Sequence, residues 1–177
     1  DPGGLTATGT VNVTFVNNTV PIAGFVRPLR ASLSFDGSND SATTAHYAAF
    51  DDIETAAGVT FESWLLTRSF TSNHSVPFDK LKVAGDFGWH MTVDRTGPGF
   101  TLFPSSSGSV ASNTIPTLNS WAHLAVSLNQ ATRETIFYVN GIEVRRATAP
   151  SALVDTGAGD SMFFGNSPSG GDEFTNG

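Results

Sequence analysis

Apolar and polar side chains alternate along most of this chain, and turn residues interrupt the alternation at short intervals. Along residues 59–67, Val59 and Phe61 fall on one side of an extended strand. Glu62 and Trp64 fall on the other side. A period of two is the pattern of a strand that places one face against a core. Apolar residues never recur at helical spacing for more than about one turn, so the pattern predicts an all-β protein.

Short runs of the same character recur along the chain, separated by Gly, Pro, Asn and Asp. They predict strands at residues 10–16, 20–26, 31–35, 42–47, 59–67, 76–83, 89–94, 100–103 and 162–164. Residues 50–57 fit either a single helical turn or a loop. Many short strands with regular turn signals are typical of a β-sandwich or a barrel.

The strongest local signal is the pair Asn140-Gly141, which lies between two strand-like runs. Both central residues of a type I′ turn need positive φ, and Asn and Gly tolerate positive φ best. Residues 136–139 and 142–145 are therefore predicted to form an antiparallel hairpin. Residues 115–128 are predicted to lie alongside it.

Length, composition and charge exclude several classes of protein. A chain of 177 residues fits one domain, and the absence of cysteine rules out a disulfide framework and thiol chemistry. The net charge of −7 argues against a nucleic-acid partner. No apolar run approaches the ~18–20 residues that span a membrane. Charged residues make up only 14%, as is common in extracellular β proteins, and glycosylation sequons occur at Asn12, Asn17, Asn39 and Asn73.

Five short motifs follow one another in the order of a known family. They are Leu-Ser-Phe-Asp-Gly-Ser-Asn-Asp at 33–40, Val-Thr-Phe-Glu-Ser-Trp-Leu at 59–65, Trp-Ala-His-Leu-Ala-Val at 121–126, Phe-Tyr-Val-Asn-Gly at 137–141 and Met-Phe-Phe-Gly at 162–165. In these motifs the chain resembles the laminin-G/pentraxin-like modules of the concanavalin A-like lectin/glucanase superfamily. The resemblance implies an antiparallel two-sheet β-sandwich of jelly-roll type over residues 31–177. Residues 1–30 are expected to form an N-terminal arm or an extra hairpin.

The resemblance also leaves one strand without a match. Modules of this family close with a strand of the form Phe-x-Gly-x-Ile-Asp-Glu-Val-x-Ile, whereas this sequence stops at Phe174-Thr175-Asn176-Gly177. Either the sequence is a fragment, or another segment fills the place of the final strand. A missing strand would leave unpaired backbone groups along a sheet edge.

The resemblance implies binding rather than catalysis. Hydrolases of this superfamily carry their acids on one strand, as Glu-x-Asp-x-x-Glu or a close variant. Glu62 stands alone on its strand, and no such run occurs. Because glycoside hydrolysis needs two carboxylates facing across a groove, the chain is expected not to be an enzyme. His123 is expected to pack and hydrogen-bond.

Calcium is the metal ion that the resemblance favours, because loops rich in Asp, Asn and Gly supply the oxygen ligands it needs. Asp86 and Asp160 resemble the acids with which some laminin-G modules bind calcium. The late loop that pentraxins use for calcium corresponds here to a stretch containing Asn166, Asp172 and Glu173. The same residues would also serve as ordinary turn formers without an ion.

Aromatic side chains on loops can stack on sugar rings, and they are the second kind of candidate site. The candidates for an exposed platform are Tyr47, Phe70, Phe87 and Trp89. Trp64 and Trp121 match positions inside the family's sandwich, so they are expected in the core.

These observations favour a noncatalytic binding or adhesion module, located outside the cell or on a particle surface. It would recognise carbohydrate or a protein surface through rim loops, with calcium as a candidate cofactor. The alternative is a structural surface protein, such as a virion decoration or fibre component or a filament component. In that case residues 1–30 and the C-terminal edge would contact neighbouring subunits, as in a homo-oligomer. A glycoside hydrolase is the third alternative.

Overall fold

A computed structural model describes part of this chain in detail. The described residues are 32–37, 40–45, 49–69, 74–80, 89–94, 99–105, 108–154 and 161–165. The chain divides into two compact units, Asp1–Leu33 and Ser34–Gly177, and the strands of the described residues belong to the second unit. The predicted N-terminal arm over 1–30, with its strands at 10–16 and 20–26, lies outside the described residues and stays a prediction.

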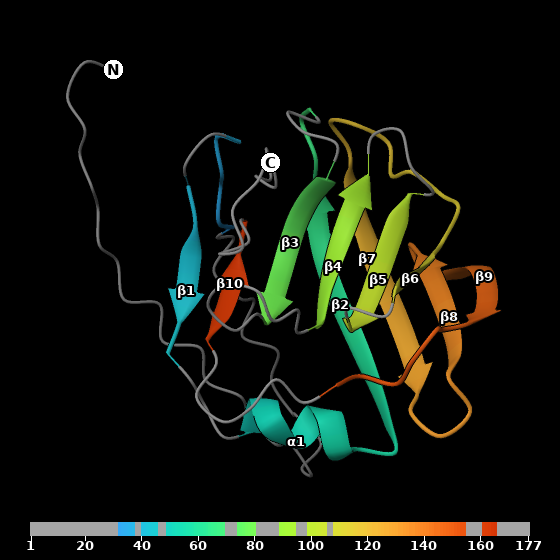
Figure 1. The fold of residues 1–177 in the computed structure, drawn as a ribbon. Coiled ribbons are helices and arrows are strands. Elements are labelled where there is room, and N and C mark those ends of the chain that lie inside the picture. The colour runs from blue at the N-terminus through green and yellow to red at the C-terminus, as the bar shows by residue number, and fades with distance from the viewer. Residues whose placement is uncertain are drawn as a thin grey trace, which may run out of the picture. The chain divides into compact units, whose positions relative to one another are not determined.

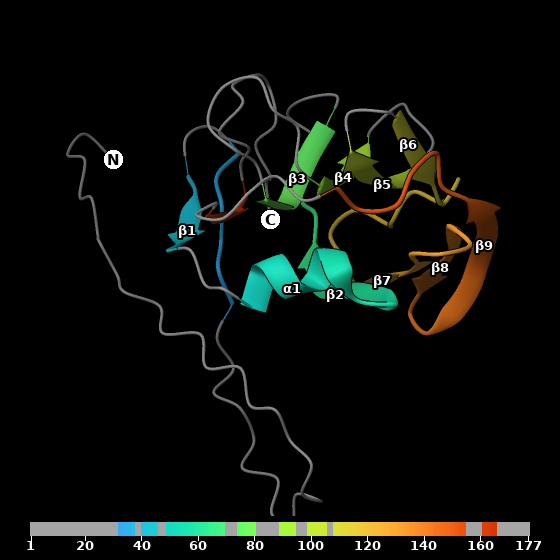
Figure 2. The same cartoon turned by 60° about the horizontal axis from the view of Figure 1, so that its bottom comes forward.

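The strands form two antiparallel sheets that pack face to face (Figure 1). Within the described residues, one sheet has the order β1 (Ala42–Thr44), β10 (Met162–Phe164), β3 (His74–Lys80), β4 (Trp89–Asp94), β5 (Phe100–Ser105) and β6 (Gly108–Ala111). The other has the order β2 (Gly58–Leu66), β7 (Trp121–Asn129), β8 (Glu134–Val139) and β9 (Ile142–Thr148). Figure 2 shows the two sheets as separate layers. The predicted two-sheet β-sandwich is confirmed.

The core lies between the sheets and is built around aromatic rings. Phe61 of the smaller sheet meets Trp89 of the larger sheet with ring centroids 4.6 Å apart, and Phe78 with centroids 5.6 Å apart. Further along the core, Phe100 and Phe137 pack edge to face at 5.2 Å. Each fully buried side chain of this size contributes roughly 1.5–3 kcal/mol to folding. These contacts hold the two layers together.

The Asn-Gly turn forms as the sequence predicts. Asn140 and Gly141 have φ angles of 52° and 78°, and they join β8 to β9. The turn is also bonded to the neighbouring strand β7. The backbone N–H of Asn140 donates to the carbonyl of His123 (2.8 Å), and the Asn140 Oδ1 accepts from the His123 N–H (2.9 Å). This pair of hydrogen bonds fixes the backbone of His123.

The described part of the chain contains one short helix, α1 (Ala49–Thr55), which lies at one end of the sandwich (Figure 1). The sequence allows either a helical turn or a loop at residues 50–57, and the structure has the helix. From α1 the Glu54 carboxylate accepts from the Lys80 Nζ (2.9 Å) and from the Trp89 Nε1 (3.0 Å). The carbonyl of Glu54 accepts from the side chain of Gln130, in the turn between β7 and β8. The helix is therefore bonded to two strands of the larger sheet and to the turn that joins two strands of the smaller one.

The predicted strand at 31–35 is wrong for the residues that can be compared, because residues 32–35 are not in a strand. The ring of Phe35 instead packs closely on Gly165, which follows β10 and has a φ of 80°. A Cβ on Gly165 would lie 2.5 Å from that ring. No helix among the described residues is long and apolar enough to cross a membrane.

Candidate functional site

The side of the four-stranded sheet that faces away from the core is here called the outer face. Its residues follow from strand alternation and from the register of β2, β7, β8 and β9. They are Thr60, Glu62, Trp64, Leu66, Trp121, His123, Ala125, Ser127, Asn129, Glu134, Ile136, Tyr138, Glu143 and Arg146. All of them lie on strands, so the backbone hydrogen bonds of the sheet hold them in place.

Two tryptophans project from one end of the outer face. Trp64 is 62% exposed and Trp121 is 51% exposed. Trp64 is paired across the sheet with His123, and Trp121 is paired in the next row with Leu66. The rings of Trp64 and His123 have centroids 5.2 Å apart and planes inclined by 52°. Trp64, Trp121 and His123 are here called the aromatic patch.

Glu62 borders the aromatic patch on the same strand as Trp64. Its Oε2 lies 3.6 Å from the Nε2 of His123. Because the Glu62 side chain is 66% exposed, solvent screens this pair and it contributes little to stability. The carboxylate keeps accepting capacity toward solvent, and the exposed ring of Trp64 is the next outer-face side chain on the same strand.

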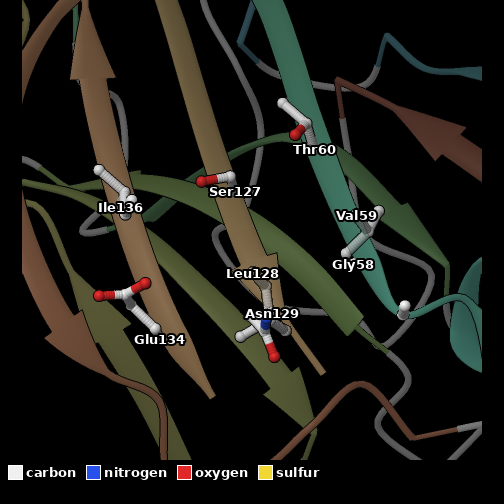
Figure 3. A pocket seen from close by; sticks show the side chains of 9 residues that line it. Gly58, Val59, Thr60, Ser127, Leu128, Asn129, Glu134 and Ile136 are labelled. Carbon is white, nitrogen blue, oxygen red and sulfur yellow. The ribbon is translucent and has the colours of Figure 1, made fainter. Parts of the chain in front are cut away.

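A shallow hollow lies toward the other end of the outer face (Figure 3). Its volume is about 360 Å³. The outer-face residues that line it are Thr60, Ser127, Asn129, Glu134 and Ile136, with Gly58 at its edge. Figure 3 shows that the three adjacent strands β2, β7 and β8 carry these residues. The lining therefore carries hydroxyl, carboxamide and carboxylate groups, of which the Asn129 Oδ1 accepts from the backbone N–H groups of Ala131 and Thr132.

Arg146 bridges two carboxylates next to the hollow. Its guanidinium donates to Glu134 Oε1 at 2.7 Å, and to both carboxylate oxygens of Glu143 at 3.1 and 3.2 Å. The hydrogen bonds to Glu134 and then to Glu143 raise the pKa of Arg146 above its ordinary value. Together with Glu62, the outer face carries three carboxylates against one guanidinium. Its charge is therefore more negative than positive.

The structure corrects the expectation that Trp89 is an exposed platform. Trp89 has no exposed surface, because it points into the core from β4 and packs on Phe61. The other candidate platforms and calcium ligands lie outside the described residues and stay predictions: Tyr47, Phe70, Phe87, Asp86, Asp160, Asn166, Asp172 and Glu173. No group of three or more His, Cys, Asp or Glu side chains able to hold a metal ion occurs among the residues described.

The expectation that Trp64 and Trp121 lie in the core is also wrong, since both are more than half exposed. The alternation along β2 indicates that Trp64 is exposed, because it places Trp64 on the same face as the charged residue Glu62. His123 packs against Trp64 and has its backbone bonded to Asn140, as expected of a packing and hydrogen-bonding residue.

Comparison with protein families agrees with this architecture. A laminin G family model, of the concanavalin A-like lectin/glucanases superfamily, matches residues 36–177. The chain belongs to this superfamily. The predicted resemblance to laminin-G modules is thereby confirmed. No curated protein matches the sequence significantly.

Solved structures of the same fold share little sequence with this concanavalin A-like chain. A heptameric SAP-like pentraxin from Limulus polyphemus has a TM-score of 0.55 and 15% identity, covering 81% of this chain and 70% of its own. The extracellular region of zebrafish Gpr126/Adgrg6 has a TM-score of 0.53 and 13% identity, with coverages of 68% and 17%. Botulinum neurotoxin type C, which interacts with two ganglioside molecules, has a TM-score of 0.52 and 14% identity, with coverages of 77% and 31%. This chain thus spans less than a third of the last two proteins, and the likeness shows the fold alone.

Proposed function

We propose that this concanavalin A-like chain is a noncatalytic binding module that recognises carbohydrate through the aromatic patch. The observation that carries the proposal is the exposure of two tryptophans on one face of a hydrogen-bonded sheet, at 62% and 51%. Large aromatic side chains are normally buried, because each can remove roughly 150–250 Å² from water. A cluster of exposed apolar surface marks an interaction site.

The chemistry of the patch suits a sugar. The rings of Trp64 and Trp121 can stack on the apolar face of a pyranose or furanose ring. The Glu62 carboxylate and the His123 ring can hydrogen-bond to the hydroxyls around its edge. Because these side chains are held by strands, little conformational entropy is lost when a ligand binds. The proposed contact surface is a sheet face, whereas the sequence favours recognition through rim loops.

The double variant Trp64→Ala/Trp121→Ala is expected to lose glycan binding. Each central aromatic anchor of an interface contributes about 2 kcal/mol or more, so each loss weakens binding by roughly 30-fold. Immobilised glycan arrays identify the ligand, and titration calorimetry measures the affinity. The melting temperature is expected to change little, because both side chains are exposed in the folded chain.

Val154→Ala is the matched control, since Val154 is an apolar side chain that is 47% exposed and lies outside the four-stranded sheet. It is expected to bind as the wild type does. A wild-type chain that binds no glycan, or a double variant that binds as well as wild type, contradicts the proposal. Release of new reducing ends from a bound glycan contradicts the noncatalytic role. If no glycan on the array binds and the patch binds a protein, the carbohydrate proposal is wrong and the partner is a protein.

We also propose a location outside the cell or on a particle surface, supported by the low content of charged residues. Assembly through residues 1–30 and the C-terminal edge stays an alternative from the sequence. Sedimentation of the full chain tests it: a stable oligomer that dissociates when residues 1–30 are removed supports the structural role.

Calcium assistance is a proposal that rests on the resemblance. If Asp86, Asp160, Asn166 and Asp172 hold the ion, excess calcium is expected to raise the melting temperature. An ion that binds only the folded state adds about 2.7 kcal/mol at about one hundred times its Kd. Scanning calorimetry with calcium and with EDTA measures the effect, and Asp86→Asn/Asp160→Asn is expected to remove it. Equal melting temperatures in calcium and EDTA contradict the proposal.

A further inference from the structure

The aromatic patch and the hollow lie in line along one strand. Trp121, His123, Ala125, Ser127 and Asn129 alternate along β7 on the outer face, with the patch at the first end and the hollow at the last. Eight residue steps of antiparallel strand lead from Trp121 to Asn129, which corresponds to roughly 27 Å between the far ends, and four steps lead from His123 to Ser127, which corresponds to roughly 14 Å between the near ends. Both distances exceed the width of one sugar ring. A single monosaccharide cannot contact both features.

Between the patch and the hollow, β7 places Ala125 on the outer face, and Ser127 begins the hollow. Ala125 and Ser127 are small residues on β7, and each is flanked by larger neighbours across the sheet. Glu62 and Tyr138 flank Ala125, while Thr60 and Ile136 flank Ser127. Ala125 itself is 6% exposed, so its neighbours cover it and no bulky β7 side chain stands between the two ends. A ligand in contact with the patch can therefore continue toward the hollow.

The charges on this surface select the class of ligand. Along β2, β7, β8 and β9 the outer face carries the carboxylates of Glu62, Glu134 and Glu143. The guanidinium of Arg146, on the same face, already donates hydrogen bonds to Glu134 and Glu143. A sulfated or carboxylated glycan would bring further negative charge against these acids. Hydroxyl groups of an uncharged glycan can instead donate to them.

From these observations we infer that the outer face binds one extended, uncharged polysaccharide chain lying along β7. The inference rests on the proposed function and deepens it, because it names the length and the charge of the ligand. Rings of the chain stack on Trp64 and Trp121 at one end. At the other end, its hydroxyls hydrogen-bond to the hydroxyls of Thr60 and Ser127 in the hollow. They also accept from the Asn129 amide N–H groups, since the Asn129 Oδ1 already accepts from the backbone of Ala131 and Thr132.

Titration calorimetry of the full chain with linear gluco-, xylo- and arabino-oligosaccharides of two, four and six units tests the inference. The affinity of at least one series is expected to rise by about tenfold or more between two and six units, which is ~1.4 kcal/mol. A heparin hexasaccharide is expected to bind more weakly than the uncharged hexasaccharide. Affinity that does not depend on length, or preference for heparin, overturns the inference and leaves the proposed function standing.

Variants of the hollow separate its role from that of the patch. Ser127→Phe fills the hollow, and Thr60→Ala/Ser127→Ala removes its hydroxyls with less risk to folding. Both are expected to reduce the affinity for six units to that for two units, and to leave the affinity for two units unchanged. Trp64→Ala/Trp121→Ala is expected to abolish binding at every length. If the hollow variants leave the length dependence intact, the inference is wrong. If the wild type binds none of these series but binds a glycan on the array, the inference is overturned and the carbohydrate proposal stands. If the array is empty as well, both fall.

Discussion

Replacing Lys80 with Met is expected to lower the free energy of unfolding by about 3 to 5 kcal/mol. The Lys80 side chain has no exposed surface and the Glu54 side chain is 1% exposed, with their charged atoms 2.9 Å apart. Removing the ammonium group leaves a buried carboxylate without its counter-ion, and water cannot reach it in compensation. The same carboxylate accepts from Trp89, so the loss also affects the centre of the core. Urea denaturation followed by tryptophan fluorescence measures the change.

The double variant Glu54→Met/Lys80→Met is the control for this prediction. It removes both charges, and replacing a buried ion pair by apolar side chains of similar volume is often close to neutral. We therefore expect the double variant to be more stable than Lys80→Met alone, which is a coupling that a double-mutant cycle measures. A single variant that loses less than about 1 kcal/mol would mean that the pair behaves as a surface salt bridge.

Replacing Gly99 with Ala is expected to lower the free energy of unfolding by about 2 to 5 kcal/mol. Gly99 has a φ of 89°, and a Cβ there would lie 2.3 Å from the carbonyl oxygen of Thr114. The close approach exists because Gly99 forms a parallel bridge with Thr114. The Ser112 hydroxyl reinforces it, by accepting from the N–H of Phe100 and donating to the carbonyl of Thr114. The added methyl group therefore displaces backbone that is fixed on both sides.

The loss of stability expected for Gly99→Ala has two causes, backbone strain at positive φ and the steric contact with Thr114. The variant Gly141→Ala separates them. Gly141 also has a positive φ, of 78°, but a Cβ there would meet no atom within 4 Å. Its replacement carries the backbone strain alone, which is about 1 kcal/mol. In thermal denaturation, the melting temperature of Gly99→Ala is expected to be well below that of Gly141→Ala. Equal losses would show that the contact with Thr114 relaxes freely.

The sequence predicts most of the strands because their signals are local. The alternation of Trp89, Met91 and Val93 with polar neighbours gives β4 with the bounds that the structure has, and Met162–Phe164 gives β10. The Asn-Gly pair gives the turn between β8 and β9. The strand prediction for residues 32–35 is wrong. These residues alternate as a strand does, but they have no neighbouring strand to pair with in the structure described.

The site is harder to predict, because alternation states which residues share a face but not which face meets the core. Trp64 shares its face with Glu62, which indicates exposure, whereas the family resemblance indicates burial. Trp89 starts the run that includes Met91 and Val93, which are buried, so the same alternation indicates its burial. Lys80 gives no local signal, since its partner Glu54 lies in a helix 26 residues away. A buried lysine is rare unless it is paired.

The outer face consists of strand residues, with the Asn140 side chain bonded to the backbone of β7 beside His123. Under the proposed function, its ligand preference would depend on which side chains occupy alternate positions of β2, β7 and β8. Substitutions at the exposed ones among these positions usually change stability little. This makes the chain a scaffold for redesign, in which a small combinatorial library over a few outward positions would generate modules for different sugars while the loops stay untouched.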